Sequence, residues 1–94
     1  MEKFLIRREI KGVSSLSRHD IGEWGKASEN ILEKMRKEGK KIKQEATYVA
    51  GDSMFCVYEA ENENLIKEHG ERFQPSFIAE IMEISAILGK NNLL

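Results

Sequence analysis

Three side chains that can do chemistry, Cys56, Tyr58 and His69, lie within one short stretch of the sequence. A thiol can act as a nucleophile or as a soft metal ligand, and a tyrosine hydroxyl can donate a hydrogen bond to a ligand. A histidine can serve as an acid, a base or a metal ligand. Each also has a structural interpretation, which we favour: Cys56 as a small hydrophobe, Tyr58 as an interface aromatic and His69 as a hydrogen-bonded core residue.

The sequence lacks the short motifs that define a metal site, a phosphate-binding loop or a nucleophile elbow. Its second histidine, His19, falls near the start of an expected helix and is expected on the surface. One cysteine and two histidines do not complete a structural metal site. We therefore favour a binding protein over an enzyme.

The charge balance argues against two classes of partner. Lys and Arg number 15 and Asp and Glu number 16, whereas nucleic-acid and anionic-membrane binders carry a basic excess. The longest apolar run, residues 54–58, is far shorter than a membrane-spanning helix, and the first residues do not form a secretory signal. A lone cysteine cannot form an intramolecular disulfide, so we expect a cytoplasmic protein.

The chain of 94 residues is expected to form one domain, with its core at about residues 3–86 and a loose tail at 89–94. Alternation of apolar and polar side chains predicts four strands. The dipeptide Gly51-Asp52 between the middle two is typical of a type II′ turn. The strands are expected at 3–10, 41–50, 53–60 and 77–86.

Two helices separate these strands. The first is expected to begin after Ser17, which can cap it, and to end at Gly39 in the left-handed conformation. The second is expected to begin after Asn62 or Asn64 and to end before Pro75. The order strand, helix, strand, strand, helix, strand predicts a ferredoxin-like α+β fold. Both helices cover one face of a four-stranded antiparallel sheet, and we expect the open face to be covered by a second copy of the chain, as in a dimeric α+β barrel.

The hairpin at residues 41–60 predicts which side chains share a face. It sets Thr47 opposite Cys56, Glu45 opposite Tyr58 and Tyr48 opposite Phe55. The face expected under the helices carries Ile42, Ala46, Tyr48, Phe55 and Val57. The open face is expected to carry Glu45, Thr47, Val49, Met54, Cys56 and Tyr58. Because His69 lies on the helix side, these faces predict no Cys56–His69 pair within one subunit.

Residues 46–60, ATYVAGDSMFCVYEA, and the later Ile66-Lys67-Glu68-His69 carry a family resemblance. With the opening Phe4-Leu5-Ile6-Arg7-Arg8-Glu9, they resemble a family of small ferredoxin-like proteins, long catalogued as a domain of unknown function, that includes a nickel-binding bacterial member. The resemblance covers about residues 3–86. It implies a homodimer built sheet to sheet and a small-ligand or metal site near the sheet, with nickel as the ion. Metal-binding relatives look richer in histidine, with one close before the proline, where this chain has Phe73-Gln74-Pro75.

Three hypotheses for function follow. The first is a homodimeric binding protein for a small ligand or, weakly, a metal ion, with Cys56 and His69 as the metal-ligand candidates. The second is a cofactor-free dimeric α+β barrel enzyme, such as a small monooxygenase or isomerase. The third is a non-catalytic interaction module. The apolar side chains expected in the dimer interface are Met54, Cys56, Tyr58 and Ile84. The residues expected to bind the ligand, mostly between the two sheets, are Arg8, Glu45, Thr47, Cys56, Tyr58, His69 and Glu80.

Overall fold

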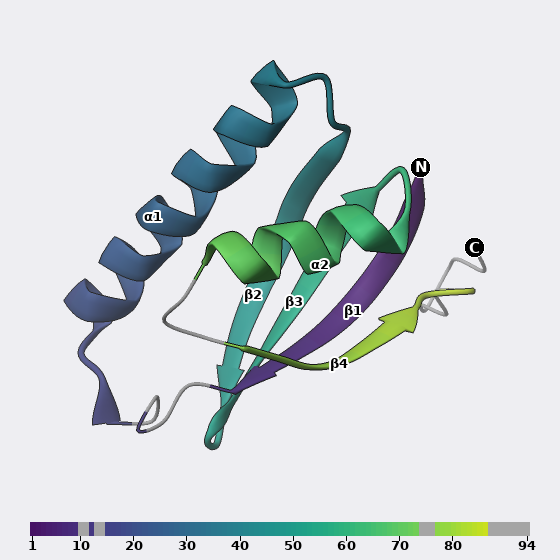
Figure 1. Ribbon diagram of the computed structural model, residues 1–94. Coiled ribbons are helices and arrows are strands. Elements are labelled where there is room, and N and C mark those ends of the chain that lie inside the picture. Colours follow the sequence, from purple (N-terminus) through teal and green to yellow (C-terminus); the bar gives the residue numbers. More distant parts are fainter. Residues whose placement is uncertain (10–11, 13–14, 74–76, 87–94) are drawn as a thin grey trace, which may run out of the picture.

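The computed structural model describes residues 1–9, 12, 15–73 and 77–86. Two helices, α1 and α2, lie on one face of a four-stranded antiparallel sheet of order β2-β3-β1-β4 (Figure 1). None of the described elements covers the opposite face, and the ferredoxin-like α+β fold is confirmed. The elements are β1 (Glu2–Glu9), α1 (Arg18–Lys37), β2 (Ile42–Ala50), β3 (Ser53–Ala60), α2 (Glu63–Arg72) and β4 (Phe77–Glu83).

Both helices begin at side-chain caps. The Ser17 hydroxyl accepts a hydrogen bond from the Asp20 amide at 3.1 Å, as predicted, and the Asn62 side chain accepts one from the Leu65 amide at 3.2 Å. These contacts satisfy backbone donors that have no partner inside the helix. No described helix is long and apolar enough to cross a membrane.

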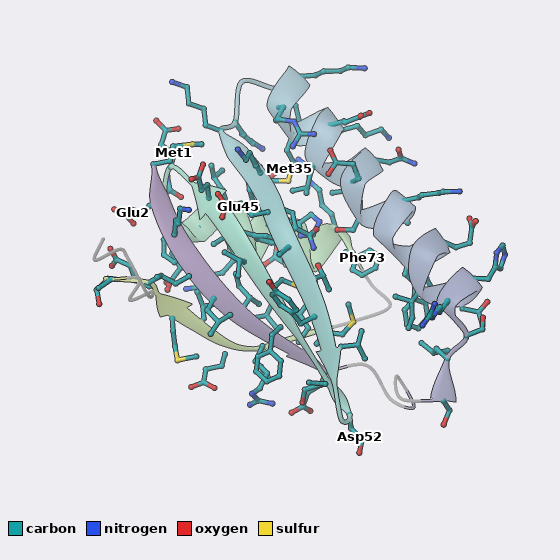
Figure 2. All side chains as sticks on the ribbon, turned by 180° about the vertical axis from the view of Figure 1, so that it is seen from behind. Met1, Glu2, Met35, Glu45, Asp52 and Phe73 are labelled. Atoms are coloured by element: carbon teal, nitrogen blue, oxygen red, sulfur yellow. The ribbon has the colours of Figure 1, made fainter. Side chains whose placement is uncertain are left out.

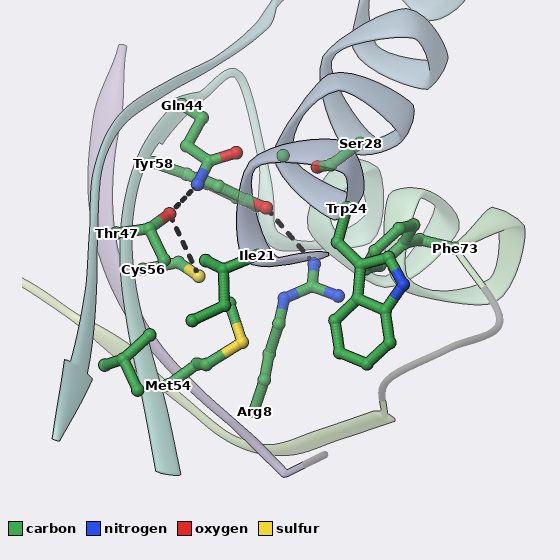
Figure 3. A pocket seen from close by; sticks show the side chains of 12 residues that line it. Arg8, Ile21, Trp24, Ser28, Gln44, Thr47, Met54, Cys56, Tyr58 and Phe73 are labelled. Carbon is green, nitrogen blue, oxygen red and sulfur yellow. Dashed lines mark hydrogen bonds between the residues drawn. The ribbon is translucent and has the colours of Figure 1, made fainter. Parts of the chain in front are cut away.

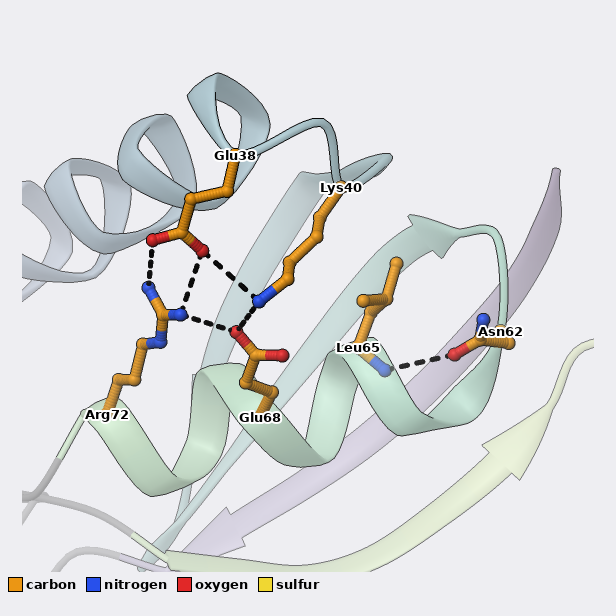
Figure 4. A network of polar contacts seen from close by, with 6 residues as sticks. All are labelled: Glu38, Lys40, Asn62, Leu65, Glu68 and Arg72. Carbon is orange, nitrogen blue, oxygen red and sulfur yellow. Dashed lines mark hydrogen bonds and ion pairs between the residues drawn. The ribbon is translucent and has the colours of Figure 1, made fainter.

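The first helix ends in a Schellman motif. Gly39 has a φ of 88°, and the amides of Gly39 and Lys40 bond back to the carbonyls of Arg36 and Met35. Beyond this end, Glu38 and Lys40 form an ion-pair network with Glu68 and Arg72 of α2 (Figure 4). The network ties the end of α1 to α2.

The hairpin turn has the predicted geometry. Gly51 has a φ of 59°, whereas Asp52 is not among the described residues of positive φ, which is the pattern of a type II′ turn. The second helix runs past Gly70, where a Cβ would lie 2.6 Å from Cδ1 of Ile78, so glycine permits the close approach of α2 to β4. The last strand ends at Glu83, three residues earlier than predicted. The predicted strand end at residue 10, Pro75 and the tail at 89–94 lie outside the described residues.

A one-residue bulge in β2 overturns the predicted faces. Thr47 pairs with Cys56 as expected, but Tyr58 pairs with Gln44, and Glu45 is the extra residue. A bulge reverses the inward and outward positions of one strand relative to the other. Ile42 is therefore in the core as predicted, whereas Ala46, Tyr48, Phe55 and Val57 lie on the open face and not under the helices.

Pairing with β1 sets the true orientation of β3. Phe4 pairs with Tyr58 and Ile6 with Cys56, and all four side chains are buried under the helices. The predicted position on the open face is therefore wrong for five residues of the hairpin: Thr47, Val49, Met54, Cys56 and Tyr58. The expected place of Met54, Cys56 and Tyr58 in a dimer interface is wrong for the same reason. They share the helix side with His69, against the predicted separation. The core contains Phe4, Ile6, Leu32, Met35, Ile42, Cys56, Tyr58, Ala60 and Ile66.

Candidate functional site

A pocket of about 190 Å³ lies between the first half of α1 and the sheet (Figure 3). Its apolar wall comes from α1, the β2–β3 hairpin and the end of α2, while its polar groups lie toward the sheet. The apolar lining residues are Ile21, Trp24, Gly25, Val49, Met54 and Phe73. The others are Arg8, Ser28, Gln44, Thr47, Cys56 and Tyr58.

Arg8 is the charged group of this pocket and is only 2% exposed. It follows Phe4 and Ile6 at every second position of β1, so strand geometry turns its side chain toward the helices. Its Nη2 atom donates to the Tyr58 hydroxyl at 3.2 Å and to Nδ1 of His69 at 2.9 Å. Its guanidinium carbon lies 5.8 Å from the ring centroids of both Tyr58 and Phe73, within the range of cation–π attraction.

His69 is fully buried behind Arg8 and does not line the pocket. Because a guanidinium can only donate, Nδ1 must accept, and the ring proton is assigned to Nε2. That nitrogen lies 3.0 Å from the Ser28 hydroxyl and 3.4 Å from the Ser28 carbonyl. Burial, followed by the positive charge of Arg8, lowers the pKa of His69 from 6.5 to about 4. The imidazole is therefore neutral at physiological pH.

Tyr58 is held as a neutral phenol. Burial raises its pKa from 10.0 to about 12, although the charge of Arg8 acts in the opposite direction. Its oxygen accepts from Arg8 and lies 3.4 Å from Nδ1 of His69, and the rings of Tyr58 and His69 meet edge to face at 5.6 Å. Tyr58 and His69 are both uncharged, so their contacts orient the guanidinium of Arg8 and add no charge to the site.

The sheet side of the pocket also carries a short chain of polar groups. Gln44 donates to the Thr47 hydroxyl, which in turn lies 3.6 Å from the Cys56 sulfur. The bulge at Glu45 brings this set together, because it places Gln44 and Thr47 on the same face. Among the described residues lining the pocket, Arg8 is the one charged side chain, so the electrostatic potential there favours an anion.

A metal ion does not suit this arrangement. Within the part of the chain that the structure describes, no three His, Cys, Asp or Glu side chains are grouped to hold one. His69 directs Nδ1 at a guanidinium and Nε2 at Ser28, so neither nitrogen is turned toward Cys56. A cation bound near this histidine would also be repelled by Arg8.

The structure brings together five of the seven side chains predicted to bind a ligand. Arg8, Thr47, Cys56 and Tyr58 line the pocket, and His69 supports it from behind. The other two, Glu45 and Glu80, lie on the open face of the sheet. Glu45 pairs with Lys3 at 3.3 Å and Glu80 with Arg7 at 3.5 Å. His19, predicted at the surface, is exposed in the first turn of α1.

Eight of the described residues that line the pocket were not predicted as site residues, among them Trp24, Ser28 and Phe73. Trp24 and Ser28 belong to the apolar stripe of α1, and Phe73 follows α2, so their spacing indicated only core positions. Ser28 carried the one usable signal, because a hydroxyl within an apolar stripe requires a hydrogen-bond partner once buried. That partner is His69.

The fold and the pocket define a ferredoxin-like α+β domain with an internal polar cluster centred on a buried arginine. A family model described as nickel responsive protein SCO4226-like matches residues 4–84. The chain belongs to this family, in agreement with the resemblance found in the sequence. No curated protein and no solved structure matches the chain.

Proposed function

We propose that this chain is a non-catalytic binding protein that holds a small anion in the pocket between α1 and the sheet. The observation that carries the proposal is the position of Arg8. Its guanidinium is buried at the inner end of an open pocket, and it is oriented by two neutral side chains, Tyr58 and His69. An anion in the pocket would lie against this buried positive charge, and hydrogen bonds between a guanidinium and an anion are among the strong ones.

The arrangement favours binding over catalysis. A general base must reach the proton that it removes, and its pKa should lie near the working pH. His69 is fully buried, accepts from Arg8 and has a pKa of about 4. Tyr58 keeps its proton across the neutral range because its pKa is about 12. Neither group meets the requirement, so the cofactor-free enzyme is the weaker hypothesis.

The family name associates a relative with a response to nickel, and the donor set of this pocket does not fit that ion. Nickel prefers imidazole and thiolate ligands with a free lone pair. Here the acceptor nitrogen of His69 lies 2.9 Å from a guanidinium nitrogen. We therefore assign no nickel site to Cys56 and His69.

The uncovered face of the sheet supports self-association. Figure 2 views the sheet from the side that the helices leave uncovered. On this side Leu5, Tyr48 and Met82 belong to an apolar band that crosses all four strands, and Tyr48 is 61% exposed. Its other members are Ala46, Phe55 and Val57. Oppositely charged side chains of β1, β2 and β4 flank the band, including Lys3, Arg7, Glu45 and Glu80. A second copy rotated by 180° offers the same band and both signs of charge, so we propose a homodimer built face to face.

Trp24 provides the test of anion binding, because it is the chain's one tryptophan and it lines the pocket. Titration of the whole protein with sodium acetate, sodium benzoate and sodium phosphate, followed by Trp24 fluorescence, should give a saturable change for at least one anion. Arg8→Gln should abolish that change, whereas Arg18→Gln, at an exposed arginine, should leave it intact. No saturable change with any anion, or an equal response in the Arg8 variant, would refute the proposal.

A further inference from the structure

The geometry points to a ligand class: we propose that the pocket binds a small aromatic monocarboxylate, with its carboxylate at Arg8 and its ring against Trp24 and Phe73. This inference rests on the proposed function. The inference specifies the charge, the shape and the size of the anion that the pocket would bind.

The polar end of the pocket suits one planar carboxylate. Charge-assisted hydrogen bonds between a guanidinium and a carboxylate are stronger than those between neutral groups. Tyr58 keeps its hydroxyl hydrogen, so it can serve as a second donor beside Arg8. Since Arg8 is the one cation among the described lining residues, the pocket balances a single negative charge.

The rest of the pocket suits a flat apolar body. Ile21 and Trp24 of α1, Met54 of the hairpin and Phe73 line this part of the pocket (Figure 3), and Val49 of the hairpin also lines it. Aromatic rings pack against one another with preferred offset or edge-to-face geometry. A volume of about 190 Å³ is below the roughly 300 Å³ at which pockets for drug-sized ligands begin. One ring with a carboxylate is therefore the appropriate size.

The same walls disfavour two other ligand types. A phosphate dianion would bring a second negative charge into a mostly apolar site, and burying an unpaired charge is costly. A neutral amide of the same shape would form a weaker hydrogen bond with Arg8, because it lacks the negative charge of a carboxylate. The pocket should therefore prefer benzoate to inorganic phosphate and to benzamide.

Gly25 provides a way to block the pocket without weakening the fold. It lines the pocket, its backbone is helical, and a Cβ built on it meets nothing within 4 Å. Gly22 has the same free space on the same helix and does not line the pocket. Leucine at either position is a better helix former than glycine. Gly25→Leu should thus fill the pocket, and Gly22→Leu is its matched control.

The test is calorimetric titration of the whole protein and its variants with sodium benzoate, benzamide, sodium acetate and sodium phosphate. We expect benzoate to bind at least about tenfold more tightly than the other three probes. Gly25→Leu should weaken benzoate binding about tenfold or more, and Gly22→Leu should not. Circular dichroism should show that both variants remain folded.

The outcomes separate this inference from the proposed function. If acetate or phosphate binds through Arg8 as tightly as benzoate, the ligand class is refuted and the anion pocket stands. If benzamide equals benzoate, charge recognition by Arg8 is refuted. If benzoate binds equally to the Gly25→Leu variant, the location is refuted. If no anion binds, both the inference and the proposed function fail.

Discussion

The Nη2 atom of Arg8 lies 2.9 Å from Nδ1 of His69, in the layer between α2 and the sheet. Arg8 determines the protonation of His69, and His69 determines the orientation of Arg8. Arg8 forces Nδ1 to be an acceptor and disfavours protonation of the ring, while the ring fixes the direction of the guanidinium. His69 is therefore a positioning residue for Arg8, and Ser28 holds its other nitrogen.

Removal of this imidazole should destabilise the protein. His69→Ala removes one buried hydrogen-bond partner each from Arg8 and Ser28 and creates a cavity, which together should lower the free energy of unfolding by about 2–3 kcal/mol. Urea denaturation measures the change. His19→Ala, at the exposed histidine, should alter stability by less than about 0.5 kcal/mol. Equal stability of the two variants would contradict the buried role of His69.

The stability of the protein should fall in mild acid. The pKa of His69 is about 4 in the folded state against 6.5 ordinarily, so the unfolded state binds more protons between these values. Folding stability therefore decreases as the pH is lowered from about 6.5 to about 4. Each pKa unit corresponds to about 1.36 kcal/mol, so the loss should reach about 3 kcal/mol.

A comparison of variants isolates the histidine. Urea denaturation at several pH values should show that His69→Ala is less dependent on pH in this window than the wild type. Glu38, whose pKa is lowered chiefly by its hydrogen bond to Arg72, also loses stabilisation as the pH falls, but at lower pH. A wild-type slope that persists in the His69 variant would assign the effect to such carboxylates.

The fold could be predicted because its determinants are local. The Ser17 cap, the Gly39 stop and the Gly51-Asp52 turn each act within a few residues, and the structure contains all three. The faces of the hairpin depend on a feature that is not local. The β2 bulge at Glu45 is set by pairing with β3, and no glycine or other turn residue marks it in the sequence.

The grouping of side chains in the candidate site could be predicted only in part, for the same reason. The residue types indicated which side chains could bind a ligand. Four of them, Arg8, Cys56, Tyr58 and His69, do lie around one polar cluster. Their common face follows from pairing of β1 with β3, which joins residues about fifty positions apart. The alternation of Phe4, Ile6 and Arg8 carried this information, since an arginine in register with two core residues must be buried with them.

The ion pairs between the end of α1 and α2 should stabilise the protein as a network. Arg72 contacts Glu38 at 2.9 Å and Glu68 at 2.6 Å, and Lys40 contacts the same two carboxylates (Figure 4). Arg72→Gln should lower the Tm by a few degrees in low salt and by less in 1 M NaCl, because salt screens exposed charges. Thermal scans at both salt concentrations measure this.

An isolated pair serves as the control for that network. Glu23 contacts Lys26 at 3.5 Å on the exposed side of α1. Glu23→Gln should leave the Tm nearly unchanged at either salt concentration. The same Tm loss from both substitutions would mean that the Arg72 contacts do not act together.

The apolar band on the open face predicts how the oligomer can be dissociated. Tyr48→Glu places a charge at the most exposed large side chain of the band and should shift a dimer toward monomer. Analytical ultracentrifugation at about 10–100 μM covers the range in which a micromolar dimer dissociates. Lys34→Glu, an exposed substitution on α1, is the control and should remain dimeric. A monomeric wild type at these concentrations would refute the homodimer.

The thiol of Cys56 should report occupancy of the pocket. Cys56 is 2% exposed and lines the pocket, so a disulfide reagent can reach it only through the space that the ligand occupies. The native protein should react at least about a hundredfold more slowly than the protein in urea, because the folded chain leaves only this narrow access to the sulfur. Saturating benzoate should slow the native reaction further. In the Gly25→Leu variant benzoate should have no additional effect, and the same slowing in that variant would show that protection arises elsewhere.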